Sequence, residues 1–132
     1  MSNKYYITTP IYYVNDKPHI GHAYTSVATD FIARFMTLNG HDVRFQTGTD
    51  EHGLKIQKAA EAKKIEPIEL CNQNSKIFRD LTVSLNLSND DFIRTTEERH
   101  IDGASYLWKR LYERDQIYLG EYTGWYSISD ET

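Results

Sequence analysis

Residues 4–9 (KYYITT) and residues 19–38 (HIGHAYTSVATDFIARFMTL) decide the fold that this sequence predicts. The first stretch is rich in aromatic and β-branched residues and ends before Pro10, which has no amide hydrogen for a sheet, so it predicts a strand. The second predicts an amphipathic helix that ends at Asn39 and Gly40, because its apolar residues recur at steps of three and four. We expect this helix to bury one face, made of Ile20, Ala23, Val27, Phe31 and Phe35.

The same order of elements then occurs a second time. Residues 43–47 (VRFQT) predict a second strand, residues 48–53 (GTDEHG) a turn-rich loop, and residues 54–63 a second helix. A strand, a loop and a helix that repeat in this way favour a parallel α/β sheet with right-handed crossovers. Ligands of such sheets bind beyond the carboxyl ends of the strands.

Two further helices are expected in the second half of the chain. One begins near Pro67 and runs to Asn86, and residues 88–91 (SNDD) interrupt the pattern. Thr95 and Glu98 have the spacing of a capping box and predict the start of a helix that runs to about Arg114. After it, residues 117–118 and 122–128 predict short strands of a β-rich piece.

Composition limits the classes of protein that this chain can belong to. The 132 residues are 39% hydrophobic and 26% charged, which suits one globular domain and excludes a disordered chain. The net charge of −4 argues against capture of nucleic acid by bulk charge. The single cysteine, Cys71, indicates a reducing compartment, and the sequence has no membrane span and no signal peptide. We therefore expect a cytoplasmic protein without a membrane partner.

Two histidines at the start of the first predicted helix are the leading candidates for chemistry. His19 and His22 are three residues apart, which places both imidazoles on nearly one side of the first turn. A helix start favours anions, the rings can donate to phosphate oxygens, and Gly21 permits close approach of a ring or a phosphate. Two alternatives are that the histidines only cap the helix or lie on the surface, and that they bind a metal with help from Asp50 or His52.

The loop at residues 48–53 holds the second candidate. Asp50 follows the second predicted strand, where parallel sheets keep their binding loops, and can pair with an ammonium group. The alternative is an Asx turn or a cap for the following helix. We expect the neighbouring Glu51 to be solvated. We also expect Asp50 and the imidazoles of His19 and His22 to converge on one cleft.

Four segments together resemble one known family. They are residues 6–15 (YITTPIYYVN), 19–22 (HIGH), 48–53 (GTDEHG) and 91–100 (DFIRTTEERH). In order and spacing they resemble the class I aminoacyl-tRNA synthetases, and among these the bacterial and organellar methionyl-tRNA synthetases. H-x-G-H alone indicates only the superfamily, whereas the flanking segments carry the amino-acid specificity. The resemblance covers essentially the whole chain.

The resemblance implies a fold and a reaction. The fold is the first half of a Rossmann-like parallel sheet with flanking helices. The reaction is that of a methionine–tRNA ligase, which joins the carboxylate of methionine to the α-phosphate of ATP, releases pyrophosphate and transfers the aminoacyl group to the terminal adenosine of tRNA-Met. The implied substrates are methionine, ATP with Mg²⁺, and tRNA-Met.

The resemblance also implies roles for residues at matching positions. His19 and His22 would stabilise the phosphates of ATP in the transition state, and Gly21 would let adenine stack against the backbone. The methionine contacts would be Asp50 for the α-ammonium group and Ile11 and Tyr13 for the side chain, where apolar and aromatic neighbours suit a thioether.

The family's lysine-bearing loop, K-M-S-K-S or a variant, does not occur in these 132 residues. A helix-start charge contributes ~0.3–1 kcal/mol, whereas enzymes lower barriers by about 8–23 kcal/mol. We therefore expect an N-terminal portion of a synthetase that is inactive alone and works with the remainder of the enzyme. Residues 1–115 would form the first half of the catalytic domain, and residues 116–132 would begin the connective-peptide insertion. Such a portion should expose apolar surface.

The resemblance further implies that no structural zinc is bound. Many relatives carry a cysteine pair in the stretch that residues 122–130 resemble, and Ser127 and Asp130 stand at these positions here. A hydroxyl and a carboxylate replace two thiolates poorly in a structural zinc site.

Two other functions remain open at this point. One is a non-catalytic truncated paralogue that binds nucleotide or RNA. The other is a different adenylyltransferase that shares H-x-G-H.

Overall fold

The computed structural model describes residues 3–127, which form four strands and four helices. Contacts divide the chain into two compact units, residues 1–101 and residues 102–132. The elements are β1 (Lys4–Thr8), β2 (Tyr12–Tyr13), α1 (Ile20–Leu38), β3 (Asp42–Asp50), α2 (Leu54–Lys63), α3 (Pro67–Ser84), β4 (Asp91–Arg94) and α4 (Glu98–Tyr112). All four predicted helices and both predicted strands of the first half are confirmed, and α2 has the predicted bounds.

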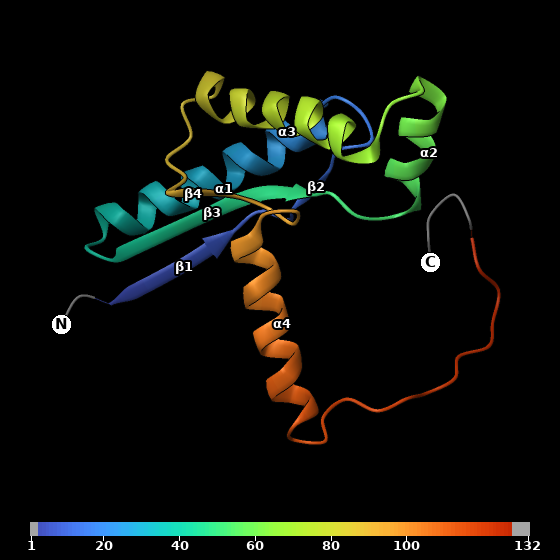
Figure 1. Ribbon diagram of the computed structural model, residues 1–132. Coiled ribbons are helices and arrows are strands. Elements are labelled where there is room, and N and C mark those ends of the chain that lie inside the picture. Colours follow the sequence, from blue (N-terminus) through green and yellow to red (C-terminus); the bar gives the residue numbers. More distant parts are fainter. Residues whose placement is uncertain (1–2, 128–132) are drawn as a thin grey trace. The chain divides into compact units, whose positions relative to one another are not determined.

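The sheet is parallel throughout and is built on the long strand β3 (Figure 1). Gln46 pairs with both β1 and β4, and Thr49 pairs with both β2 and β4, so β1 and β2 lie along one edge of β3 and β4 along the other. Thr8 pairs with Gln46 and Tyr12 pairs with Thr49. The chain between β1 and β2 therefore has one residue more than the stretch of β3 that lies opposite it. Pro10 lies in this interruption, where its missing amide hydrogen costs nothing.

Helices α1 and α3 cover one face of the sheet (Figure 1). Tyr12 points to this face, because its hydroxyl lies 3.0 Å from Ser26 Oγ of α1 and its ring stacks on Phe78 of α3. The core lies between β2, β4, α2 and α3 and consists of Tyr12, Val14, Ile56, Ala60, Leu70, Cys71, Phe78 and Phe92. The opposite face of the sheet is exposed at Tyr6 and Tyr13.

Several strand predictions were wrong. Strands β2 and β4 were not predicted, and β3 continues through Gly48, Thr49 and Asp50, which were expected to belong to a loop. In the second half, residues 117–118 and 122–127 form no strand, and Ile128 lies outside the described residues. The reason is that short strands exist only where a partner pairs with them, and β3 supplies such a partner for β2 and β4.

The prediction of the buried face of α1 was also wrong. Ile20 is 85% exposed and Phe31 70%, whereas the residues that the helix buries are Ser26, Thr29, Asp30 and Ala33. Small side chains let α1 approach the sheet closely, and the Asp30 carboxylate accepts hydrogen bonds from both the amide and the hydroxyl of Ser88, each at 2.6 Å. The apolar stripe therefore faces solvent, which confirms the expected exposed apolar surface.

Helix α4 also exposes apolar side chains, among them Ile101, Trp108, Leu111 and Tyr112, and unlike α1 it has no buried residue. Of the helices in residues 3–127, none is both long enough and apolar enough to cross a membrane.

Candidate functional site

His19 and His22 close the amino end of α1 with a reciprocal pair of hydrogen bonds. His19 is the N-cap residue, and its Nδ1 accepts a hydrogen bond from the amide of Gly21 at 3.1 Å. The amide of His19 in turn donates to Nδ1 of His22 at 3.0 Å, so the pair forms a capping box in which histidines replace the usual polar residues. The capping interpretation of these histidines is thus confirmed.

The caps also determine where each ring carries its proton. Because a backbone amide always donates, Nδ1 of His19 and Nδ1 of His22 must both be acceptors, and the proton of each neutral ring is on Nε2. The ring centroids lie 3.8 Å apart. Burial and then the proximity of His19 lower the pKa of His22 below its usual 6.5, which keeps this ring neutral at pH 7. Each histidine therefore retains one N–H donor, at Nε2, for a ligand.

A side chain at residue 21 would crowd the capping ring of His19. A Cβ atom at residue 21 would lie 2.9 Å from Cε1 and 3.1 Å from Nδ1 of His19. The predicted role of Gly21 was close approach of a ligand; the close approach seen here is that of the capping imidazole itself.

Tyr12 connects His22 to the core. The rings of Tyr12 and His22 meet edge to face with centroids 4.8 Å apart, and Phe78 meets His22 in the same way at 5.1 Å. Tyr12 is 8% exposed, and its hydroxyl is held by Ser26. The orientation of His22 is therefore determined by buried aromatic side chains from β2 and α3.

Asp50 is the last residue of β3 and forms an Asx turn. Its Oδ1 accepts a hydrogen bond from the amide of His52 at 3.3 Å, so the Asx interpretation is confirmed. The cap interpretation is wrong, because the N-cap of α2 is Gly53, with no side-chain hydrogen bond. Asp50 is half-buried and pairs in register with Tyr13 of β2.

Of the predicted methionine-side residues, Asp50 and Tyr13 pair in the sheet, and Ile11 lies just before β2. Side chains alternate along a strand, and Thr49 contacts Ser75 of α3, so Asp50 points to the opposite face together with its partner Tyr13. Tyr13 and Ile11 are each 42% exposed. Lys55 Nζ lies 5.8 Å from the centroid of the Tyr13 ring.

The two halves of the predicted site both lie next to β2. His22 packs against Tyr12, and Asp50 pairs with Tyr13, which is the next residue of the chain. Both halves therefore lie at the carboxyl edge of the sheet, and they flank it from opposite faces. Within residues 3–127, no hydrogen bond or ion pair joins Asp50 to either histidine.

The prediction that Glu51 is solvated was wrong. Its side chain has 0% exposure and forms a bidentate salt bridge with Arg94, with 2.7 Å from Nε to Oε1 and 2.9 Å from Nη2 to Oε2. Burial alone raises the pKa of Glu51, but hydrogen bonds from Arg94, Thr96 and Thr49 outweigh it and hold the pKa below the usual 4.5. No local sequence pattern signals this burial, because the main partner of Glu51 is Arg94, 43 residues away.

The metal interpretation of the histidines receives no support. Across residues 3–127, no group of three or more His, Cys, Asp or Glu side chains is arranged to hold a metal ion. Burial, and then the charge of Glu51, raises the pKa of the Cys71 thiol to about 11, so this thiol is protonated at neutral pH.

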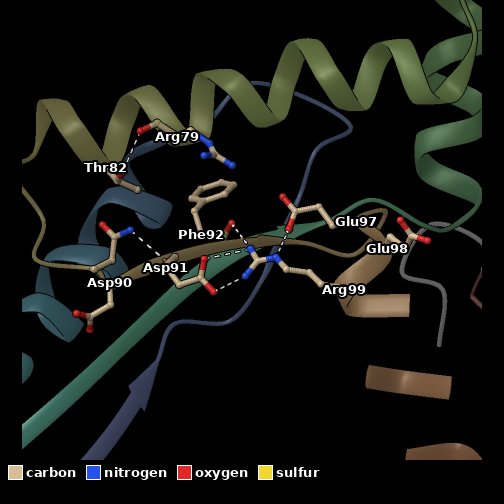
Figure 2. A pocket seen from close by; sticks show the side chains of 9 residues that line it. Arg79, Thr82, Asp90, Asp91, Phe92, Glu97, Glu98 and Arg99 are labelled. Carbon is tan, nitrogen blue, oxygen red and sulfur yellow. Dashed lines mark hydrogen bonds and ion pairs between the residues drawn. The ribbon is translucent and has the colours of Figure 1, made fainter. Parts of the chain in front are cut away.

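A polar depression of about 540 Å³ lies between α3, β4 and the start of α4, and none of the predicted site residues lines it (Figure 2). Arg99 donates to Asp91, Glu97 and the backbone oxygen of Phe92, while the guanidinium of Arg79 lies 4.8 Å from the centroid of the Phe92 ring. Arg99, Asp91 and Glu97 are thus engaged with one another.

Comparison with known proteins agrees with these observations. Residues 5–132 match the family described as tRNA synthetases class I (M). The methionine–tRNA ligase of Rickettsia bellii is 60% identical over 99% of this chain and 26% of its own length, and that of Mesorhizobium japonicum is 56% identical over 97% of this chain and 25% of its own length. The chain thus spans about a quarter of these curated relatives.

Solved structures share the fold. The methionyl-tRNA synthetase of Mycobacterium tuberculosis in complex with methionyl-adenylate superimposes with a TM-score of 0.90 at 48% identity, over 100% of this chain and 26% of that one. The LeuRS of Agrobacterium radiobacter, at 20% identity, shares the fold alone, with a TM-score of 0.78 over 98% of this chain and 17% of that one. Since the family match covers nearly the whole chain and the capped H-x-G-H turn stands beside a parallel sheet, the chain belongs to the class I tRNA synthetases of the methionine type.

Proposed function

We propose that these residues are the N-terminal portion of a methionine–tRNA ligase, in which they contribute the ATP and methionine contacts. The observation that carries the proposal is the arrangement of His19 and His22, whose Nδ1 atoms are both used by caps and whose Nε2–H groups remain as donors. Two neutral donors at a helix start suit the phosphates of ATP. The identity to enzymes named methionine–tRNA ligase supports the same assignment.

The proposed reaction has two steps. A carboxylate oxygen of methionine attacks the α-phosphorus of ATP, the bond to the bridging oxygen of the β-phosphate breaks, and pyrophosphate leaves. A hydroxyl of the terminal adenosine of tRNA-Met then attacks the carbonyl carbon of the adenylate and releases AMP. ATP enters as its magnesium complex, and His19 and His22 donate to phosphate oxygens as charge accumulates on them.

The amino acid is proposed to bind at Asp50. Its carboxylate accepts from the α-ammonium group, while the exposed Ile11 and Tyr13 contact the methionine side chain. Because Tyr12 and Tyr13 are consecutive, methionine at Asp50 and ATP at His22 would lie across one edge of the sheet. The methionyl-adenylate bound by the synthetase of Mycobacterium tuberculosis supports one continuous site for both substrates.

We assign residues 1–115 to the first half of the catalytic domain and residues 116–132 to the start of the connective-peptide insertion. The exposed apolar stripe of α1 supports a need for the remainder of the enzyme, so we expect no adenylate formation by residues 1–132 alone. We place the activity in the cytoplasm, which the single cysteine supports.

Residues 122–130 are proposed to lack structural zinc, because Ser127 and Asp130 are not thiolates; Asp130 lies outside the described residues. Metal analysis of the purified full-length protein should give no stoichiometric zinc, and one zinc per chain would contradict this part of the proposal.

Methionine-dependent exchange between pyrophosphate and ATP tests the proposal in the full-length protein. Asp50→Ala should abolish the exchange and retain ATP binding. The matched control is Asp42→Ala, which removes an exposed aspartate at the other end of the same strand and should leave the exchange unchanged. A different adenylyltransferase would show no methionine-dependent exchange in the parent protein, and its exchange with its own substrate would tolerate Asp50→Ala. A non-catalytic paralogue would show no exchange with any substrate.

A further inference from the structure

We propose that Glu51 is a positioning residue that holds the Asp50 carboxylate at the carboxyl edge of the sheet. The proposal rests on the function proposed above, in which Asp50 receives the ammonium group of methionine. Glu51 touches neither substrate in this scheme and acts through its neighbour.

The Glu51 carboxylate has all of its accepting positions filled. Oε1 accepts from Thr49 Oγ1 at 2.8 Å and from Arg94 Nε, and Oε2 accepts from Arg94 Nη2 and from Thr96 Oγ1. A carboxylate with 0% exposure is tolerated only when such partners satisfy it, so the side chain has one well-defined position.

The backbone of Glu51 is tied down as well. Its amide donates to Thr95 Oγ1 at 2.8 Å, and its carbonyl oxygen accepts from Cys71 Sγ at 3.7 Å. Arg94 also donates to Asn72 of α3 at 2.7 Å. Through this single residue the end of β3 is therefore joined to the end of β4 and to α3.

Few interactions of the Asp50 side chain itself fix its position. Within residues 3–127, its carboxylate has one hydrogen bond, from the His52 amide at 3.3 Å, which belongs to the same turn. The direction of the Asp50 side chain consequently depends on the backbone that Glu51 anchors. An ion pair weakens with distance, and a displacement of ~1 Å costs up to about 100-fold in a well-oriented site.

Glu51→Gln in the full-length enzyme tests the proposal. Arg94 donates to both oxygens of Glu51, so the amide nitrogen of a glutamine faces an Arg94 donor in either orientation. We expect the KM for methionine to rise about tenfold while the KM for ATP is unchanged, because a shift of part of an ångström affects Asp50 and leaves the α1 cap intact. The pyrophosphate exchange assay measures both constants.

Two variants complete the experiment. Thr96→Ala removes one donor to Glu51, preserves the salt bridge and should raise the KM for methionine less, in the same direction; it carries the test if Glu51→Gln does not fold. Glu97→Gln removes a half-buried partner of Arg99 that does not contact Glu51, and it should change neither KM. An unchanged KM for methionine, or a parallel rise of both KM values with a lower melting temperature, would overturn the positioning role. If Asp50→Ala itself leaves methionine binding intact, the function proposed above fails instead.

Discussion

Gly48 is the residue whose replacement should damage this fold most directly. It lies in β3 and pairs with Ile93 of β4. A Cβ atom on residue 48 would lie 2.0 Å from the backbone oxygen and 2.6 Å from Cγ2 of Ile93. The backbone oxygen of Ile93 is held in β4 by the pairing with β3 and cannot swing aside as the end of a side chain can, so Gly48→Ala forces the two strands apart.

The size of the effect follows from these distances. Atoms in contact are separated by ~3.5 Å, so the strands must separate by roughly 1.5 Å locally. Overpacking of this kind costs about 1–3 kcal/mol, and two weakened backbone hydrogen bonds add about 1 kcal/mol each. We expect a total loss of about 3–5 kcal/mol, a large share of the ~5–15 kcal/mol that stabilises an ordinary domain.

The assay is urea unfolding of residues 1–132 followed by far-ultraviolet circular dichroism, with Gly103→Ala as the control. Gly103 lies in α4, and a Cβ atom on this residue would meet no other atom within 4 Å, so alanine there should stabilise the helix by about 0.5–1 kcal/mol. The reasoning is refuted if Gly48→Ala unfolds at the same urea concentration as the parent chain.

Two further predictions concern His22 and the exposed face of α1. Because the pKa of His22 is lower in the folded than in the unfolded chain, its neutral ring contributes stability that is complete above pH 6.5 and is lost as the pH falls through the folded pKa. As the pH falls below 6.5, the melting temperature should thus fall less steeply in His22→Gln than in the parent chain, and equal slopes would contradict this. In residues 1–132, Phe78→Ala should cost about 3–5 kcal/mol because Phe78 is 2% exposed, whereas Phe31→Ala should cost little because Phe31 is 70% exposed; equal losses in urea unfolding would contradict the packing of α1.

Local sequence features were enough to predict the helices. Helix α2 begins after Gly53 and ends at Lys63 as predicted, and the start of α1 at the H-x-G-H turn was predicted from the apolar pattern that begins there. Capping residues, glycine stops and a period near four residues are properties of neighbouring residues, so they are recognisable without knowledge of the rest of the fold.

The family was also evident from the sequence, because its motifs are short runs whose order and spacing survive in the chain. The positions of the individual site residues within the fold were not evident from the sequence. Whether Glu51 lies in water or in a salt bridge depends on Arg94, which is 43 residues away, and no local pattern contains that distance.

The three-dimensional arrangement determines which residues find partners. The pair Tyr12–Tyr13 and residues 91–94 are strands because β3 lies beside them, whereas the β-prone residues 117–118 have no pairing strand in the described part of the chain. The apolar stripe of α1 was predicted to be buried because apolar side chains tend to leave water. The sheet instead packs against the small and polar residues on the other face of this helix. Local patterns in the chain were therefore sufficient to predict the helices and the family. Contacts between residues far apart in the sequence determined the sheet, the burial of Glu51 and the placement of Asp50 and His22 at one edge of the sheet. Such contacts form only when the chain folds, so no local pattern contains them.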